Sequence, residues 1–169
     1  MGHDLLIRGG STIATDGGVE ASDVLVRDGA INRVGASIDE PGCPVLDASD
    51  AYVLPGLINA HYHSAENFNP GLYENLPLDL WFIHSHQVTR SEPPSREAIY
   101  ARTMLGAMLM LRNGVSCCVD FLFEAPEITL ETLEPVVEAY RDAGMRATIL
   151  LGVTDRTFAD SLPLTDDER

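Results

Sequence analysis

The residues of this chain best suited to chemistry are two histidines one residue apart, His61 and His63, at the end of an apolar run. In an extended strand alternate side chains share a face, so both imidazoles project to one side and Tyr62 projects to the other. Imidazoles placed in this way can both bind one Zn²⁺ or Fe²⁺ at about 2.0 to 2.1 Å, provided that other elements complete a shell of four or five ligands. The alternative is a strand whose histidines only donate hydrogen bonds in a polar rim.

A second pair with the same spacing, His84 and His86, lies in a stretch with apolar residues at helical intervals. This stretch predicts a helix over residues 76–88, and residues two apart on a helix are separated by about 200° around its axis. The two rings therefore cannot share a metal ion. We interpret them as histidines of the surface or of a pocket rim.

The first part of the chain is predicted to be a small β region, because short apolar runs alternate with turn residues. Asp28-Gly29 separates two of these runs and is a strong signal for a type I′ hairpin, in which both central residues need positive φ. The expected strands span residues 4–8, 11–14, 23–27, 30–34, 45–48 and 52–54. Two short hairpins bury little surface, so this region is too small for a good sandwich by itself.

Beyond His63 the pattern changes to strands that alternate with helices. A polar loop over residues 64–75 precedes the helix at 76–88, and Ser95 is a suitable N-cap for a second helix. The expected elements after Ser95 are a helix at 96–112, a strand at 115–121, a helix at 130–141 and a strand at 146–153. Pro135 fits the last helix only if it lies in the first turn. Such alternation is typical of βαβ units with a parallel sheet.

The first barrel strand of the amidohydrolase superfamily is similar to the segment from Leu54 to His63, in which Pro-Gly, an apolar pair and two histidines keep fixed offsets. Tyr62 departs from the small polar residue usual there, but it points away from the metal side. The resemblance implies an α/β fold: a small β region at residues 1–54, sandwich-like, followed at 55–169 by the first part of a (β/α)₈ TIM-type barrel. His61 and His63 would then bind a catalytic divalent metal, zinc or iron.

The barrel that this resemblance implies is incomplete in the chain. A (β/α)₈ barrel needs roughly 200 to 250 residues, and only 115 run from Pro55 to Arg169. Either the sequence is the front part of a longer protein, or the missing strands come from elsewhere. In the family, the N-terminal β segment also joins strands from the C-terminal part of the same chain.

Working residues of α/β barrels lie at the carboxyl ends of strands. Asp120 and Asp155 meet that condition, and we favour a solvated or loop-fixing carboxylate for each, although Asp120 is also suited to orienting an imidazole. The family often uses the loop and helix after the first strand for the substrate pocket. By that analogy the candidate substrate contacts are Glu66, Asn67 and Trp81, with simple packing an equal alternative for Trp81.

The resemblance implies metal-assisted hydrolysis by hydroxide, with a carboxylate moving the proton. Residues 57–61 (LINAH) and 75–78 (NLPL) resemble the deaminase-like branch, which releases ammonia from an amino-substituted heterocycle. Chlorohydrolase-like and imidazolonepropionase-like activities stay open. No catalytic acid or base can be assigned. The competing interpretation is a truncated, non-catalytic fragment, or a subunit that needs a second chain to complete the site.

Composition narrows the partners and the compartment. The chain has 11 basic residues, all arginine, against 26 acidic ones, for a net charge of −15, which argues against nucleic-acid and anionic-membrane binding. The partner that the family resemblance implies is a small-molecule substrate. Three cysteines make a disulfide framework improbable and favour the cytoplasm. An unpaired strand edge favours self-association, so a homo-oligomer is one expected state.

Overall fold

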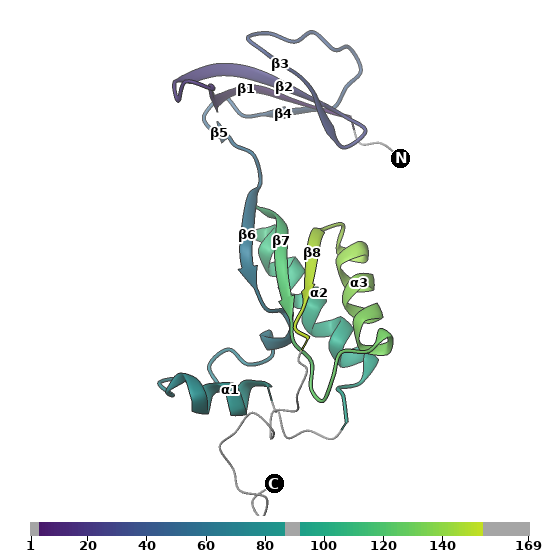
Figure 1. Cartoon of the computed structure of the whole chain (residues 1–169). Helices are drawn as coiled ribbons and strands as arrows, with labels where there is room; N and C mark the ends of the chain where they lie inside the picture. The colour runs from purple at the N-terminus through teal and green to yellow at the C-terminus, as the bar shows by residue number, and fades with distance from the viewer. Residues whose placement is uncertain (1–3, 87–91, 154–169) are drawn as a thin grey trace, which may run out of the picture. The chain divides into compact units, whose positions relative to one another are not determined.

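The computed structural model describes residues 4–86 and 92–153 of the chain (Figure 1). These residues belong to two compact units, Met1–Pro55 and Gly56–Arg169. The first unit is a β sheet with turns. The second contains parallel strands connected by helices, and it carries the histidine pair.

The first unit is a single five-stranded sheet. Its strands are β1 (Leu5–Ile13), β2 (Val19–Arg27), β3 (Ala30–Gly35), β4 (Val45–Asp47) and β5 (Tyr52–Val53). They follow the order β3-β2-β1-β4, and β5 also pairs with β1. The region predicted to be sandwich-like therefore supplies one sheet within its described residues.

Two turns explain how this sheet is built. Asp28 and Gly29 have φ of 50° and 76°, and Arg27 pairs with Ala30 across them, so the predicted hairpin is confirmed. The two strands predicted at 4–8 and 11–14 are one strand, β1, whose register shifts between Ile7 and Gly10. Gly9 lies in this bulge with φ of 72°, a conformation that glycine adopts without steric cost.

The first unit has a core of Leu6, Leu25 and Ile38. The buried carboxylate of Asp23 links two backbone segments of this unit. Asp23 Oδ1 accepts a hydrogen bond of 2.7 Å from the amide of Gly9, and Oδ2 accepts one of 2.9 Å from the amide of Ile38. These two backbone donors lower the pKa of Asp23, the Ile38 amide having the larger effect. The carboxylate thus pairs backbone groups that the bulge and the following loop leave open.

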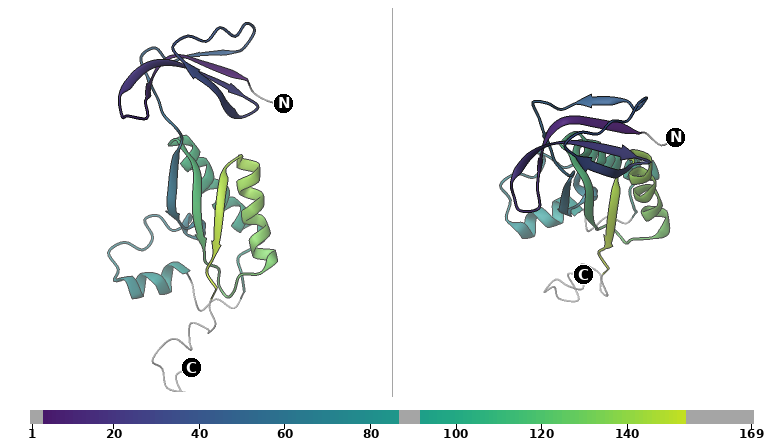
Figure 2. Two further views of the ribbon diagram at one scale, coloured as in Figure 1. Left: turned by 45° about the horizontal axis from the view of Figure 1, so that its top comes forward. Right: turned by 90° about the horizontal axis from the view of Figure 1, so that it is seen from above.

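The second unit has a three-stranded parallel sheet in the order β6-β7-β8. The strands are β6 (Leu57–Tyr62), β7 (Val115–Leu122) and β8 (Arg146–Leu151), and the helices α2 (Arg96–Arg112) and α3 (Leu130–Ala143) cover one of its faces (Figures 1 and 2). The fold is therefore a β sheet followed by parallel β/α units, as predicted, and it corresponds to part of a (β/α)₈ barrel.

Alternate side chains of β7 point into the core of the second unit. Cys118 and Leu122 are buried against helix residues that include Ile99 and Tyr140, whereas Phe121, on the other side of the strand, is 43% exposed. One face of the sheet is thus packed against helices and the other carries accessible apolar and polar groups. The histidines belong to the accessible side.

α2 and α3 begin at the residues predicted for them, but Pro135 does not lie where it was expected. Ser95 Oγ accepts a hydrogen bond from the Ala98 amide at the start of α2, as predicted. α3 is capped by Thr129 and contains Pro135 in its second turn, so the expectation that Pro135 fits only in the first turn was wrong. Packing outweighs the lost backbone hydrogen bond, because Pro135 is fully buried against the rest of the unit.

The connection after β6 contains a short 3₁₀ helix, η1 (Ser64–Glu66), and then the helix α1 (Leu78–His86). The helix predicted at 76–88 thus begins two residues later, and its last residues lie outside the described ranges. Asp155 also lies outside them. Within the described residues, no helix combines the length and apolar character needed to cross a membrane.

Candidate metal centre

The two histidines after the Pro-Gly break lie against each other. His61 is on β6, and His63 directly follows the strand with extended backbone angles. Their Nε2 atoms are 3.1 Å apart, and the rings meet edge to face with centroids 4.9 Å apart. Both imidazoles therefore lie on the same side of the strand, as the spacing of two predicts.

The nitrogen pair has the geometry of two ligands of one ion. Atoms 3.1 Å apart can both lie about 2.0 to 2.1 Å from a single point, with roughly 95–100° between the two bonds, which suits a tetrahedral zinc ion. Across residues 4–86 and 92–153, no group of three or more His, Cys, Asp or Glu side chains is placed to hold a metal. The pair thus fits a divalent metal as two of its ligands.

A backbone carbonyl orients the His63 ring. His63 Nδ1 lies 2.9 Å from the carbonyl oxygen of Phe121. Because a carbonyl only accepts, Nδ1 carries the proton in this bond, and Nε2 of the neutral ring keeps a lone pair. This is the arrangement in which a ligating histidine is held by a partner behind it. The sequence offered no signal for Phe121, because the bond uses its backbone.

Asp120 holds the residue after His63 instead of the imidazole itself. Its side chain is fully buried; Oδ1 accepts a hydrogen bond of 2.9 Å from the Ser64 amide, and Oδ2 accepts one of 2.8 Å from the hydroxyl of Tyr140 on α3. The loop-fixing interpretation of Asp120 therefore agrees with these contacts, and the solvated one does not. Direct orientation of a ring by Asp120 is also excluded, because its two described partners are an amide and a phenol.

Between the histidines, Tyr62 points to the helix side, where it meets α2. Its hydroxyl donates to Asn67 Oδ1 at 2.9 Å, and burial raises the pKa of Tyr62 to about 12. A Cβ atom at Gly106 of α2 would lie 1.7 Å from this hydroxyl and 2.3 Å from Asn67 Nδ2. The absence of a side chain at Gly106 is what lets β6, η1 and α2 approach so closely.

The three predicted substrate contacts have different surroundings. Asn67 Nδ2 donates to the Arg102 carbonyl at 2.8 Å, so its amide joins η1 to α2. Glu66 is half-buried, and burial raises its pKa although His63 and His61 act to lower it. Trp81 and Glu66 line one hollow of about 240 Å³ together with Tyr73. Substrate contact by Glu66, Asn67 and Trp81 stays a prediction.

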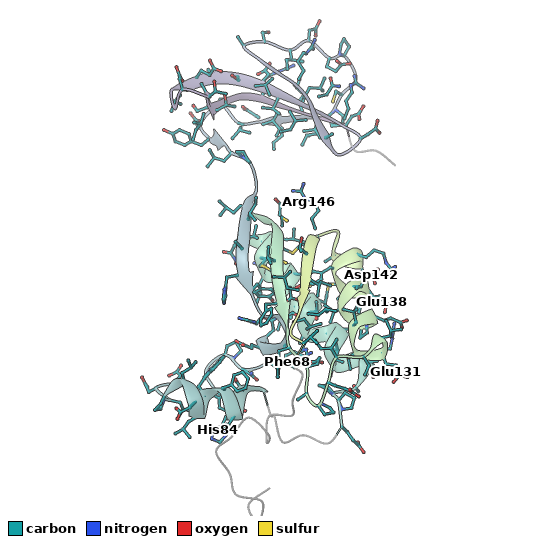
Figure 3. All side chains as sticks on the ribbon, in the orientation of Figure 1. Phe68, His84, Glu131, Glu138, Asp142 and Arg146 are labelled. Carbon is teal, nitrogen blue, oxygen red and sulfur yellow. The ribbon has the colours of Figure 1, made fainter. Side chains whose placement is uncertain are left out.

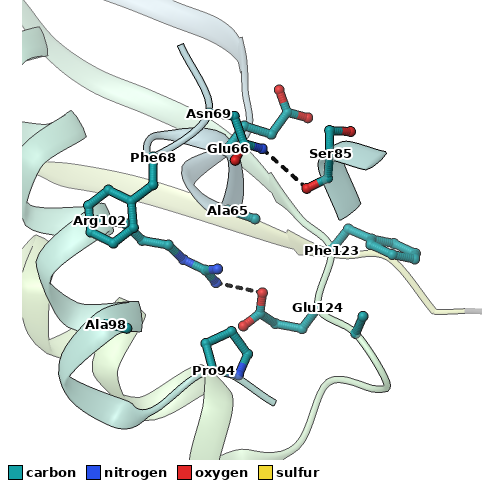
Figure 4. Close-up of a pocket in the computed structure, with 11 residues that line it drawn as sticks. Ala65, Glu66, Phe68, Asn69, Ser85, Pro94, Ala98, Arg102, Phe123 and Glu124 are labelled. Atoms are coloured by element: carbon teal, nitrogen blue, oxygen red, sulfur yellow. Dashed lines mark hydrogen bonds and ion pairs between the residues drawn. The ribbon is translucent and has the colours of Figure 1, made fainter. Parts of the chain in front are cut away.

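A second cavity, of about 190 Å³, is also lined by Glu66 (Figure 4). One of its walls is a buried ion pair, in which Arg102 Nη2 lies 2.5 Å from Glu124 Oε1. The side chains of Arg102 and Glu124 are 8% and 3% exposed. Neither residue was predicted from the sequence. Arg102 could have been found, because it shares a face of α2 with Ile99 and Gly106, and an arginine on a buried face needs a partner.

His84 projects from α1 (Figure 3) and is exposed. Its ring stacks on Tyr73 with centroids 5.9 Å apart and 20° between the planes. α1 is helical at this point, as the interpretation of His84 and His86 requires. That neither histidine binds metal stays a prediction.

Comparison with protein families gives one match that covers most of the chain. The model of the amidohydrolase family matches residues 52–169. A 5-methylthioadenosine/S-adenosylhomocysteine deaminase of Pyrococcus furiosus is 40% identical over 124 residues, which are 73% of this chain and 29% of that protein.

Two solved structures are also similar. A triazine hydrolase from Arthrobacter aurescens has a TM-score of 0.80 at 20% identity, over 98% of this chain and 39% of its own. An adenosine deaminase from Xanthomonas campestris with bound zinc has a TM-score of 0.69 at 27% identity, over 85% of this chain and 33% of its own. The chain thus spans about a third of the length of the proteins that it matches.

Proposed function

Because the chain belongs to the amidohydrolase family, we propose that it supplies the first metal-binding strand of a hydrolase that removes the amino group of a heterocycle. His61 and His63 bind the divalent metal, zinc or iron, through their Nε2 atoms. The observation that carries the proposal is the 3.1 Å separation of these nitrogens, with the His63 ring held from behind by the Phe121 carbonyl. The zinc in the adenosine deaminase of Xanthomonas campestris supports the choice of metal.

The substrate that we propose is an adenine nucleoside with a thioether substituent. The support is the deaminase of Pyrococcus furiosus, whose name gives 5-methylthioadenosine and S-adenosylhomocysteine and which is 40% identical. The reaction adds water at the carbon that bears the amino group, breaks that carbon–nitrogen bond and releases ammonia. The likeness to triazine hydrolase, at 20% identity, supports the fold alone.

The residues of the candidate site contribute to this reaction by binding and positioning. A bound divalent metal lowers the pKa of water toward about 7 and so supplies hydroxide at neutral pH. The Phe121 carbonyl keeps His63 in the tautomer that leaves Nε2 open. Trp81 and Glu66 line one hollow and contact the substrate, whereas Asn67 positions η1 against α2.

The competing proposal is that the chain is a non-catalytic fragment or a subunit completed by a second chain. It is favoured by the ligand set, because the described residues contain no group of three side chains placed to hold a metal, and a catalytic zinc site has three protein ligands. The first proposal and this one differ in what the chain does by itself. We expect residues 1–169 alone to bind metal weakly and to release no ammonia from adenine nucleosides.

A chimeric enzyme tests the proposed function. This chain would replace the matching segment of the Pyrococcus furiosus deaminase, and ammonia release from 5-methylthioadenosine would be measured with added zinc. We expect turnover that His61→Ala or His63→Ala abolishes and that the control His84→Gln leaves unchanged. A folded, active chimera that keeps its turnover after His61→Ala and His63→Ala would contradict the metal role.

A further inference from the structure

A buried carboxylate connects α3 to the residue that follows His63. Asp120 is fully buried and uses both oxygens, one for the Ser64 amide and one for the Tyr140 hydroxyl. Since both partners donate, the carboxylate acts only as an acceptor, which is the behaviour of its ionised form. Its contacts therefore depend on the charge as well as on the shape of the side chain.

Two consecutive residues of β7 hold two consecutive residues after β6. The Asp120 side chain binds the Ser64 amide, and the Phe121 carbonyl binds His63 Nδ1. Asp120 is also the register partner of Tyr62 in the sheet. The direction of the His63 ring and the backbone that carries it are thus both set by the end of one neighbouring strand.

Tyr140 fixes the carboxylate from the helix side. It is 3% exposed, and burial, followed by the charge of Asp120, raises its pKa. The hydroxyl therefore stays protonated and donates to Asp120 Oδ2 at 2.8 Å. The chain of contacts runs from α3 through Tyr140 and Asp120 to Ser64, one residue from the imidazole.

We propose that Asp120 and Tyr140 are positioning residues of the histidine pair, which keep His63 Nε2 beside His61 Nε2 and so raise the affinity of the pair for a divalent cation. The proposal rests on the metal role given to His61 and His63 above. A negative charge whose described partners are neutral groups also favours a cation nearby. The neutral variant of Asp120 should therefore bind the cation more weakly even where it keeps the fold.

The test uses variants with matched controls at an exposed pair that joins α2 to α3. Asp120→Asn and Tyr140→Phe break the buried pair. Asp142→Asn and Tyr100→Phe break an exposed pair of the same chemistry, in which the Tyr100 hydroxyl donates to Asp142 Oδ2 at 3.2 Å; Asp142 lies on α3 in Figure 3. Zinc affinity would be measured by titration of the full chain below the melting temperature of every variant. The proton on His63 Nδ1 would be followed by ¹⁵N NMR.

We expect zinc affinity to fall roughly 10-fold in Asp120→Asn and by less in Tyr140→Phe, the lower end of the range for partners behind a ligand. The His63 Nδ1 proton should exchange faster in both, and both controls should match the unchanged chain. A purely structural role would lower the melting temperature and leave these two readouts alone, and that result would overturn the proposal. If Asp120→Asn does not fold, the zinc affinity of Tyr140→Phe and the exchange of its His63 Nδ1 proton test the proposal.

Failure of the proposed function gives a different pattern. Should His61→Ala and His63→Ala both bind zinc as well as the unchanged chain, the metal site itself would be wrong. Should they lose zinc while Asp120→Asn and Tyr140→Phe keep it, only the positioning role would be overturned. The two proposals are therefore separated by the same set of titrations.

Discussion

Each of the two units buries an aspartate whose two oxygens accept hydrogen bonds, but the partners differ. Asp23 accepts from two backbone amides of its own sheet and the loop beside it. Asp120 accepts from one amide and from a tyrosine on a helix, and the same unit has a second buried pair, Arg102 with Glu124. In the first unit the buried carboxylate satisfies backbone amides, whereas the second unit buries polar side chains in pairs with one another.

The different partners of the buried polar side chains indicate which unit carries functional residues. Buried ion pairs contribute little net stability compared with apolar residues of the same size, so stability alone does not account for the pair of Arg102 with Glu124. In the second unit one member of each buried pair, Asp120 or Glu124, lies near the end of β7 or just after it, where α/β barrels carry their working residues. The comparison predicts that polar substitutions in the two units will have different consequences.

The largest expected effect follows from breaking the buried pair of Arg102 with Glu124 in the second unit. Glu124→Gln leaves the Arg102 charge buried without its carboxylate, which should lower the free energy of unfolding by about 3–5 kcal/mol. Urea unfolding followed by fluorescence of Trp81, the single tryptophan of the chain, reports on this unit. The control is Glu134→Gln at the exposed pair with Arg96, where the loss should stay below about 1 kcal/mol. Equal small losses would remove the distinction between the two kinds of pair.

A smaller effect is expected at the close approach of α2 to β6. Gly106→Ala places a methyl group against the Tyr62 hydroxyl and the Asn67 amide, and such overpacking costs about 1–3 kcal/mol. Urea unfolding is followed here by far-UV circular dichroism, which reports on both units. Gly35→Ala in the first unit is the control, because a Cβ there meets no atom within 4 Å. An unchanged transition in Gly106→Ala would mean that η1 does not pack on α2 as described.

Some features of this chain depend only on the local sequence, and others depend on tertiary contacts. The Asp28-Gly29 turn and the shared face of His61 and His63 depend on neighbours in the chain, and both were predicted. The bonds from Phe121 to His63 and from Asp120 to Ser64 depend on the register between two strands more than fifty residues apart, which no local pattern contains. Pro135 was misjudged for the same reason, since its place in α3 is decided by tertiary packing.

The smallest expected effect is the pH dependence of the stability that Asp23 contributes to the first unit. Two amides lower the pKa of Asp23 in the folded chain, so its contribution to stability is complete above the unfolded value of about 3.9 and is lost as pH falls through the lower folded value. The amide resonances of Gly9 and Ile38 should follow this titration by NMR. Asp23→Asn should abolish it. A midpoint at or above about 3.9 would contradict the closed backbone contacts of the first unit.

The most direct test of the central claim is a zinc titration of the chain followed by ¹⁵N NMR of its imidazoles. If His61 and His63 bind one ion, their Nε2 resonances will move together along a single binding curve, while His63 Nδ1 stays protonated against the Phe121 carbonyl and His84 does not respond. Movement of only one of the two resonances, an equal response from His84, or no response at millimolar zinc would contradict the account.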